Sequence, residues 1–584
     1  MSVEFRKDLF ADERDDDLNE VGKPTRRQDI LGHVTGRSPF FDDHRFDGML
    51  HIRCVRSPYH HARIRNIDTS RAETMPGVVR IMRGADVPVN LNTLLSLLDF
   101  GKDDEPVLAV DKVAYKGEPV LAIIAESEAQ AHDAVNAVRV DYEELPHVLD
   151  VEEAIKPGAP SVNLTYPNNK FEFYGGTDKQ KLRFGDVETG FARADYIVEG
   201  RYQMAPIEQA PIEPNGAIAL PETNDRWACY TSTQGLFFTL GTAAKLLDVS
   251  SSRLHFIGGT VGGGFGGKVD GLCEPLAILG AMLTGRPVRY VLDRAEEMQV
   301  SAPRSAEVWY IKDGLASDGR IIARQFTGYF DSGAYTRLTS YGVVKCTGHL
   351  PGPYTIPNVQ SDLYCVYTNR TPATAMRGFG VTGADFAIER HMDKGARAVG
   401  MGPLEFRLIN AYRDGDMKAH RRLAGNCALI ESIQAAAARA NYPLTSEYMQ
   451  MSSSQGGGGE RAQIPATRLQ DGSELPAGTR RIAAADHAPG LIPQVGVDVP
   501  VSGKPSTSAT PAAPAPAQAQ TQFAASPAMR GYGASSLGQS APPPAPPPPA
   551  ATPAAEASPP PAAKPQGSPG PRYSRYSKIG NRRR

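Results

Sequence analysis

The sequence predicts a mixed α/β or α+β body followed by a disordered tail. Short strand-like runs alternate with helical patterns up to about residue 445. A Gly-rich segment, residues 258–268, separates a strand candidate from a helix candidate. Residues 501–570 hold 18 of the 48 prolines, so the end of the chain differs in composition from the rest. With 584 residues the chain is long enough for several domains.

The first unit spans residues 25–155. Alternating apolar residues predict strands at 49–54 and 119–124. Alanines at helical spacing predict a helix over 127–137, and strand character resumes at 138–142. The helix therefore connects two strands, as in a mixed α/β or α+β domain.

The second unit spans residues 163–445 and repeats this mixture with longer helices. Helical patterns occupy 239–247 and 274–283, and the region 402–444 carries apolar helix faces. From 446 to 584 a Ser/Gly run gives way to Ala, Pro, Ser and Gln. Such a segment buries too little apolar surface to offset an ordering cost of about 1–2 kcal/mol per residue, which predicts disorder.

Charge and cysteine content exclude several classes of function. Lys plus Arg is 63 and Asp plus Glu is 65, a net charge of -2 that gives no reason to bind nucleic acid. No apolar stretch reaches the roughly 18 residues of a membrane span, and the charged N-terminus does not resemble a signal peptide. The isolated cysteines match no zinc or iron–sulfur motif and suggest reduced core thiols in a cytoplasmic protein. They are Cys54, Cys229, Cys273, Cys346, Cys365 and Cys427.

The Gly-rich segment is the strongest chemical signal in the sequence. A strand candidate at 254–257 precedes it and a helix candidate begins near 272. Glycine allows positive φ and close approach of a ligand to backbone amides, so the expected ligand is a phosphate or another oxyanion. The segment also ends like a nucleotide P-loop at Lys268, but Val269 replaces the Ser or Thr that would bind magnesium. A turn required only for close packing is the alternative interpretation.

A dinucleotide site is a second formal interpretation of the same glycines. Gly262, Gly264 and Gly267 satisfy G-x-G-x-x-G, and Asp293 follows the next strand candidate. This pattern would suit a Rossmann-type, NAD-dependent dehydrogenase. On its own the motif is a weak indication.

Motifs spaced along residues 25–444 resemble the large, molybdenum-cofactor-binding subunit of the xanthine dehydrogenase and aldehyde oxidase family. The resemblance implies an a/b hammerhead domain, then the first part of a molybdopterin-binding domain. In the first unit the matching segments are 32–36, 56–58, 61–64, 76–78 and 141–146. In the second unit they are 213–214, 232–234, 262–268, 285–288, 352–354 and 375–380.

The resemblance also implies roles for individual residues. Gln234 would direct its amide at an oxygen ligand of the metal. Phe265 and Gly266 would lie against the metal's other side, with the amides of residues 264–267, Gly264 and Gly267 included, offered to the pterin. Arg377 would bind cofactor or substrate oxygens with its guanidinium. No residue is expected to bind the metal directly.

Two further residues would line the substrate pocket. Phe379 would hold a flat ring or an aldehyde side group by stacking. Val269 stands where purine-oxidising members carry a glutamate, which favours an aldehyde or a less polar N-heteroaromatic ring over xanthine. Lys345 is compared with a pocket arginine of some members, at loose spacing.

The family reaction is the hydroxylation of an aldehyde carbon or of a ring carbon next to nitrogen, with oxygen from water. The cofactor would be molybdopterin with molybdenum, either as such or in its cytosine dinucleotide form. Electrons would leave to an iron–sulfur small subunit and an FAD-binding medium subunit, because this chain has no cysteine cluster.

A second cofactor-binding half, with its late glutamate base, is not found in the sequence. Residues 456–459 followed by Glu460 imitate the expected G-x-G-E string within a Ser/Gly run, where a base could not be held in position. The catalytic base is therefore unassigned. Three hypotheses follow: a molybdenum hydroxylase subunit completed by another chain, a truncated and inactive assembly remnant, and the NAD-dependent dehydrogenase.

Overall fold

Seven strands from two distant parts of the sequence form the first β-sheet. The computed structural model describes residues 24, 26–454 and 502–503. The strand order is β11-β10-β9-β12-β1-β5-β3, and β1 lies parallel to β12 with Leu50 opposite Val288. The two units expected from the sequence therefore share one sheet. The strands are β1 (Leu50–Arg56), β3 (Val78–Met82), β5 (Pro119–Ala125), β9 (Gly216–Glu222), β10 (Arg226–Thr231), β11 (Leu254–Gly258) and β12 (Val288–Val291).

Three helices cover this sheet. α7 (Glu274–Thr284) packs on β9, β10 and β12, and all of its residues from Glu274 to Ala281 are buried. Pro275 in its first turn and Gly285 after its last residue are the residue types that begin and end helices. α3 (Glu128–Ala137) packs on β1 and β5, and α6 (Leu236–Leu246) packs on β11 and α7.

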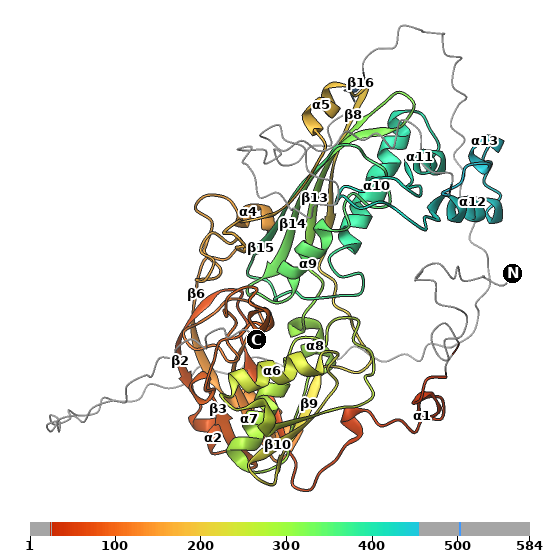
Figure 1. Cartoon of the computed structure of the whole chain (residues 1–584). Helices are drawn as coiled ribbons and strands as arrows, with labels where there is room; N and C mark the ends of the chain where they lie inside the picture. The colour runs from red at the N-terminus through yellow and green to blue at the C-terminus, as the bar shows by residue number, and fades with distance from the viewer. Residues whose placement is uncertain (1–23, 25, 455–501, 504–584) are drawn as a thin grey trace, which may run out of the picture. The chain divides into compact units, whose positions relative to one another are not determined.

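The second sheet has the order β16-β8-β13-β14-β15-β7. Figure 1 shows its long central strands with α9 and α10 beside them. Arg324 on β14 pairs with Asp313 on β13 through two hydrogen bonds of 2.7 and 2.6 Å, and neither side chain is exposed. The elements are β7 (Gln180–Phe184), β8 (Tyr196–Met204), β13 (Glu307–Leu315), β14 (Ile321–Gly333), β15 (Val359–Tyr367), β16 (Ser502–Gly503), α9 (Thr339–Thr347) and α10 (Thr382–Ala398).

The remaining elements are short. A third sheet has the order β4-β2-β6, formed by β2 (Ala62–Asp68), β4 (Lys112–Val113) and β6 (Arg139–Glu144). The other helices are α1 (Ile30–Val34), α2 (Ser70–Glu73), α4 (Val151–Ala154), α5 (Val187–Ala192), α8 (Arg294–Val300), α11 (Pro403–Asn410), α12 (Leu429–Arg439) and α13 (Ser446–Met449). The 3₁₀ turns are η2 (Phe41–Asp43), η3 (Gly84–Asp86), η4 (Leu94–Leu98) and η5 (Ser251–Arg253).

The mixed α/β class and most of the expected elements are confirmed. The expected strands at 49–54, 119–124 and 138–142 correspond to β1, β5 and β6. The helix expected over 127–137 is α3, which Ser127 caps by accepting a hydrogen bond from the Gln130 amide. α6 and α7 correspond to the helices expected at 239–247 and 274–283. The helical region expected at 402–444 is instead two helices, α11 and α12, joined by an irregular segment.

The ordered body extends beyond its expected end at residue 445. α13 follows, and Tyr448 and Met451 pack on the apolar cluster around Ile430. Ser453 is buried, and its amide donates to the Glu431 carboxylate at 2.7 Å. These contacts keep the chain attached to the body through Ser454, although its sequence is rich in serine. The rest of the expected tail, with residues 456–460, lies outside the described residues.

Most of the cysteines lie in the apolar cores. All six cysteines are unpaired thiols, and five of them are buried. Among the residues that the structure describes, no helix combines the length and the apolar character that crossing a membrane requires.

Candidate functional site

The Gly-rich loop leaves the end of β11 in an unusual backbone conformation. Gly263, Phe265 and Gly266 have φ values of 97°, 52° and 105°. Positive φ is costly for a bulky residue such as Phe265, and strain of this kind is concentrated at functional sites. At Gly266 a Cβ would lie 2.4 Å from the Ala375 carbonyl oxygen, so only glycine fits there. Phe265 is 45% exposed.

A buried ion pair between Lys268 and Glu213 fixes the position of the loop. Lys268 Nζ lies 2.7 Å from Glu213 Oε2, and the exposed fractions of the two side chains are 0% and 10%. The same oxygen accepts a hydrogen bond of 2.8 Å from the Gly262 amide. Burial lowers the pKa of Lys268, and the Glu213 carboxylate opposes this shift. Lys268 therefore cannot reach a phosphate as a P-loop lysine does, and the P-loop interpretation is excluded.

Gln234 lies against the loop, next to Gly264. Its side-chain carbonyl accepts hydrogen bonds from the amides of Gly266, at 2.9 Å, and Lys268, at 3.4 Å. A Cβ at Gly264 would lie 2.4 Å from Gln234 Oε1. The carbonyl end of the side chain is thus used by the protein, whereas its NH₂ group has no protein partner in the described part of the chain. Only that end can donate to a ligand.

Arg377 lies at the loop's edge. Its backbone amide donates to the Phe265 carbonyl at 2.8 Å. Its guanidinium is exposed and forms no hydrogen bond or ion pair within residues 26–454. The backbone nearby is fixed by Arg304, which donates to the Arg377 carbonyl at 2.5 Å, and by Gln209, which donates to the Ala375 carbonyl at 2.8 Å. A fixed backbone with an unpaired guanidinium is suited to binding an anion.

The loop's donors fall into two groups. The amides of Gly266, Gly267 and Lys268 donate within the protein. The amides of Gly263, Gly264 and Phe265 have no hydrogen-bond partner among the described residues. Of the four amides expected to meet the pterin, those of Gly264 and Phe265 are therefore available.

These donors fit a pterin cofactor that carries oxygen atoms. Three loop amides, the Gln234 NH₂ group and the Arg377 guanidinium have no protein partner among the described residues, and Gln234 and Arg377 are both bonded to the loop through other atoms. Within the described residues, no cluster of His, Cys, Asp and Glu is suited to hold a metal ion.

The two expected pocket residues, Phe379 and Val269, are both half-buried and pack against the large core cluster of the second sheet. The Phe379 ring lies 6.3 Å from the Tyr341 ring and 6.0 Å from Lys345 Nζ. Val269 lies near Gly235, at the start of α6. Their role in a substrate pocket stays a prediction.

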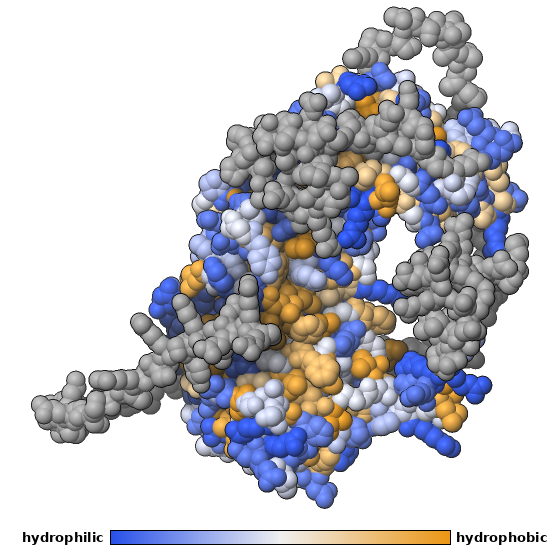
Figure 2. Space-filling model, in the orientation of Figure 1, coloured by the Kyte–Doolittle hydropathy of each residue, from blue (hydrophilic) through white to orange (hydrophobic). Residues whose placement is uncertain are grey.

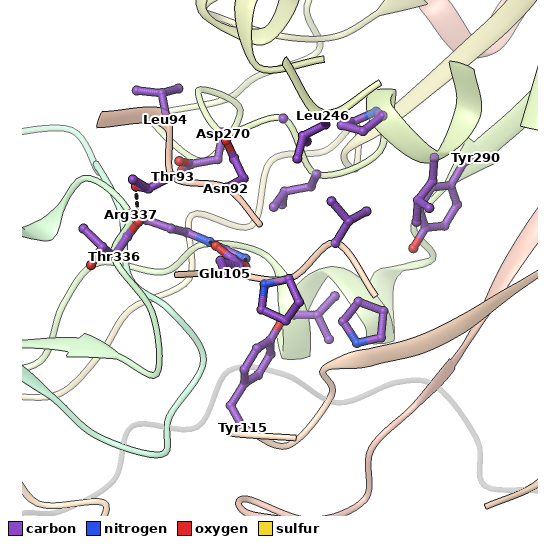
Figure 3. Close-up of a pocket in the computed structure, with 18 of the residues that line it drawn as sticks. Asn92, Thr93, Leu94, Glu105, Tyr115, Leu246, Asp270, Tyr290, Thr336 and Arg337 are labelled. Atoms are coloured by element: carbon purple, nitrogen blue, oxygen red, sulfur yellow. Dashed lines mark hydrogen bonds and ion pairs between the residues drawn. The ribbon is translucent and has the colours of Figure 1, made fainter. Parts of the chain in front are cut away.

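A small cavity of about 80 Å³, lined by both polar and apolar side chains, lies where Asp270 leaves the loop. Figure 3 shows Arg337 extended toward Glu105, with Tyr115 beside them. Arg337 donates to both Glu105 carboxylate oxygens, at 2.6 and 3.0 Å. Asp270 Oδ2 has no partner in the described protein, and burial raises the pKa of this carboxyl. The cavity is too small for a pterin or an aromatic ring and suits ordered water.

The dinucleotide interpretation does not agree with the geometry. Asp293 caps α8 by accepting a hydrogen bond from the Glu296 amide at 2.8 Å. A ribose-binding carboxylate would need to be free for its ligand. β9 is antiparallel to both β10 and β12, so the sheet is not the parallel sheet of a Rossmann domain.

Two residues that position the loop were not predicted in that role. Glu213 is part of a matching motif, but its pairing with Lys268 depends on a contact between residues 55 positions apart. Gln209 lies under Gly267 and bridges the carbonyls of Ala302 and Ala375, each at 2.8 Å. A single glutamine in a loop gives no signal in the sequence of such a bridge.

Two family models match the chain. The molybdopterin cofactor-binding domain matches residues 165–411, and the aldehyde oxidase and xanthine dehydrogenase a/b hammerhead domain matches residues 35–146. Among curated proteins, the nicotinate dehydrogenase large molybdopterin subunit of Eubacterium barkeri is 31% identical over 428 residues, which cover 73% of this chain and 97% of that protein. The nicotine 6-hydroxylase large subunit of Paenarthrobacter nicotinovorans is 32% identical, over 68% of this chain and 49% of that protein.

A solved structure extends this similarity to the fold. The aldehyde oxidoreductase from Desulfovibrio gigas is 30% identical, with a TM-score of 0.66. The match covers 72% of this chain and 47% of that chain. The chain thus spans nearly all of one relative and about half of the other two described here.

Proposed function

The chain belongs to the aldehyde oxidase and xanthine dehydrogenase family, and from that premise we propose that it is the subunit that binds the molybdenum–pterin cofactor of a molybdenum hydroxylase. The observation that carries the proposal is that Gln234 and Arg377 are both hydrogen-bonded to the Gly-rich loop. These segments are far apart in sequence but joined by hydrogen bonds of 2.9 and 2.8 Å.

The chain's own residues bind and orient the cofactor. The amides of Gly263, Gly264 and Phe265 donate to its oxygens, and the Arg377 guanidinium binds an anionic group. The Gln234 NH₂ group would donate to an oxygen atom of the bound cofactor. When bound, the cofactor supplies hydroxylation chemistry in which water provides the oxygen atom. Its cytosine dinucleotide form is compatible with the same donors.

The proposed substrates are aldehydes or N-heteroaromatic rings. Phe379 offers an aromatic wall, and Val269 offers no carboxylate that would bind a polar heterocycle. Relatives whose names include nicotinate dehydrogenase and aldehyde oxidoreductase support both substrate classes. Iron–sulfur and FAD-binding partner subunits are proposed to accept the electrons.

A second polypeptide is proposed to complete the cofactor site. The supporting feature is an apolar strip, defined as Phe237 and Phe238 on α6, Leu97 and Leu98 on η4, and Tyr341 on α9. Phe237 is 82% exposed. Figure 2 shows apolar side chains gathered in the middle of the drawn face, in the region where Figure 1 labels α6 and α9.

Some of the strip's elements pack on one another. η4 packs on α6, and a Cβ at Gly241 of α6 would lie 3.2 Å from the Leu97 side chain. Phe100, just after η4, lies 6.2 Å from the Tyr341 ring, and Tyr341 borders Phe379. Apolar patches of this kind mark protein interfaces. Because the chain spans about half of the aldehyde oxidoreductase, the proposed occupant is a chain that carries the remaining part of the molybdopterin-binding domain.

Substitution of Arg377 tests the cofactor site. We expect Arg377→Met to weaken cofactor binding about 10- to 100-fold, because a charge-assisted hydrogen bond contributes about 1.5–3 kcal/mol. The readout is molybdenum and pterin retained by the purified complex after gel filtration. The Tm should shift by no more than about 1–2 °C, since the guanidinium is exposed and unpaired.

Arg390→Met is the matched control for this experiment. Arg390 is also exposed but lies in α10, away from the loop in the sequence, and its loss should leave the cofactor content unchanged. Full molybdenum and pterin content in Arg377→Met would contradict the proposed role of Arg377.

A further inference from the structure

A second cavity, of about 510 Å³, lies between the residues that follow α9, the start of α10 and the segment 412–427. Its volume is within the range of small-molecule sites, about 300–1,000 Å³. None of the residues assigned above to the cofactor or to the substrate pocket lines this cavity. The lining side chains that can carry a charge near neutral pH are His349, Asp385, Lys418 and His420.

A tight turn at 418–422, with the sequence Lys-Ala-His-Arg-Arg, concentrates positive charge beside the cavity. The Lys418 amide donates to the Arg422 carbonyl at 2.9 Å, and the Arg421 amide donates to the Lys418 carbonyl at 2.8 Å. These bonds hold the side chains of the turn close together. Neither Lys418 nor Arg422 forms an ion pair with any residue that the structure describes.

His420 lies at the centre of this positive charge. Its Nδ1 atom is buried and has no hydrogen-bond partner in the described protein. Burial lowers the pKa of His420, and so do the positive charges of Lys418, Arg422 and His349. His349 follows α9, so cationic groups from two separate segments act on one another here. A buried polar atom without a protein partner normally contacts water or a ligand.

His349 can add a further donor to the cavity. Its Nδ1–H group donates to the Lys345 carbonyl at 2.7 Å, and its Nε2 atom has no partner in the described part of the chain. When His349 is protonated, Nε2 becomes a donor for an anion. Asp385 is the acidic lining residue, and burial together with the Glu389 carboxylate raises the pKa of its carboxyl group.

Two carboxylates of the same segment do not offset this positive charge, because neither lines the cavity and both are used elsewhere. Asp416 is buried and accepts hydrogen bonds from the Thr355 hydroxyl at 2.5 Å and the Arg413 amide at 2.9 Å. Asp414 accepts a hydrogen bond of 2.8 Å from the Cys427 amide.

We propose that this cavity binds a small organic dianion, whose carboxylate or phosphate oxygens accept hydrogen bonds from Lys418, His420 and His349. The site is separate from the proposed cofactor and substrate sites, and the inference goes beyond the proposed function. Lys418 and a protonated His349 or His420 provide two positive charges against the one carboxyl group of Asp385. A dianion should therefore bind more tightly than a monocarboxylate of similar size.

The two sources of such a group, a dicarboxylate and a phosphate ester, are distinguished by three probes: malonate, inorganic phosphate and acetate. The experiment is isothermal titration calorimetry of the purified full-chain complex at constant ionic strength. We expect malonate or phosphate to bind about 10-fold more tightly than acetate. Tighter binding of malonate would assign the ligand to dicarboxylates, and tighter binding of phosphate would assign it to phosphate esters.

Substitutions in the turn place this binding in the cavity. We expect Lys418→Met to weaken binding of the preferred dianion about 5- to 30-fold, because it removes a charge-assisted hydrogen bond. Arg422→Met, at an exposed position near His420, should weaken it about 3- to 10-fold. Lys156→Met, which removes an exposed lysine paired with Glu153, should change nothing.

Four outcomes would overturn the inference. Binding of none of the three probes would show that the cavity holds only water. Equal binding of acetate and the dianions would remove the preference for two negative charges. Dianion binding that is unchanged in Lys418→Met and Arg422→Met would place the ligand elsewhere. Loss of molybdenum and pterin from the Lys418→Met complex would assign the cavity to the cofactor instead.

Discussion

Replacing Lys268 by methionine is expected to lower the free energy of unfolding by about 3–5 kcal/mol and to abolish cofactor retention. The change leaves the Glu213 carboxylate buried without its cation, and breaking a buried pair from one side costs about that much. Glu213 also holds the Gly262 amide, so the loop loses its support on the inner side. Urea denaturation and molybdenum analysis of the purified complex measure the two effects.

The double variant Glu213→Gln with Lys268→Met distinguishes the effect of an unpaired buried charge from the effect of changed side-chain packing. It removes both charges and keeps side chains of similar size, and we expect it to recover at least half of the stability lost in Lys268→Met. Lys156→Met, at an exposed pair, should cost no more than about 1 kcal/mol. A Lys268→Met protein as stable as the parent would contradict the buried-pair account.

The second large effect is expected for Gly266→Ala. The new methyl group would lie 2.4 Å from the Ala375 carbonyl oxygen, in a backbone with φ of 105° that alanine rarely adopts. Strain of this kind costs about 1–3 kcal/mol, and the backbone of the loop or of residues 375–377 must move. We expect at least a 10-fold loss of bound pterin, measured by fluorescence of the released pterin.

Gly259→Ala is the matched control in the same loop. The nearest atom to its added Cβ would be the Pro39 carbonyl oxygen, 4.0 Å away, and Gly259 does not have positive φ. Its pterin content should equal that of the parent. Normal pterin content in Gly266→Ala would show that the close approach of loop and residue 375 is not required.

The sequence predicted the helices and strands that depend on residue patterns within one short segment. Helix α3 was predicted from alanines at helical spacing over 127–137, and α7 from the helical pattern over 274–283. The motifs at 232–234, 262–268 and 375–380 indicated segments that the structure brings together through the Gln234 and Arg377 contacts.

Features that depend on tertiary contacts were not predictable. The pairing of β1 with β12 joins residues more than 200 positions apart and merges the two expected units into one sheet. Ser453 lies in a Ser-rich stretch but is buried, and its amide donates to Glu431 on α12. The sequence also contained no indication that Gln234 uses its carbonyl within the protein and has only its NH₂ group free.

The most direct test of the cofactor proposal is elemental and pterin analysis of the complex purified with every subunit that accompanies this chain. The account predicts about one molybdenum and one pterin per copy of the chain, together with a second polypeptide that carries the rest of the molybdopterin-binding domain. Absence of both molybdenum and pterin from the intact complex would contradict it.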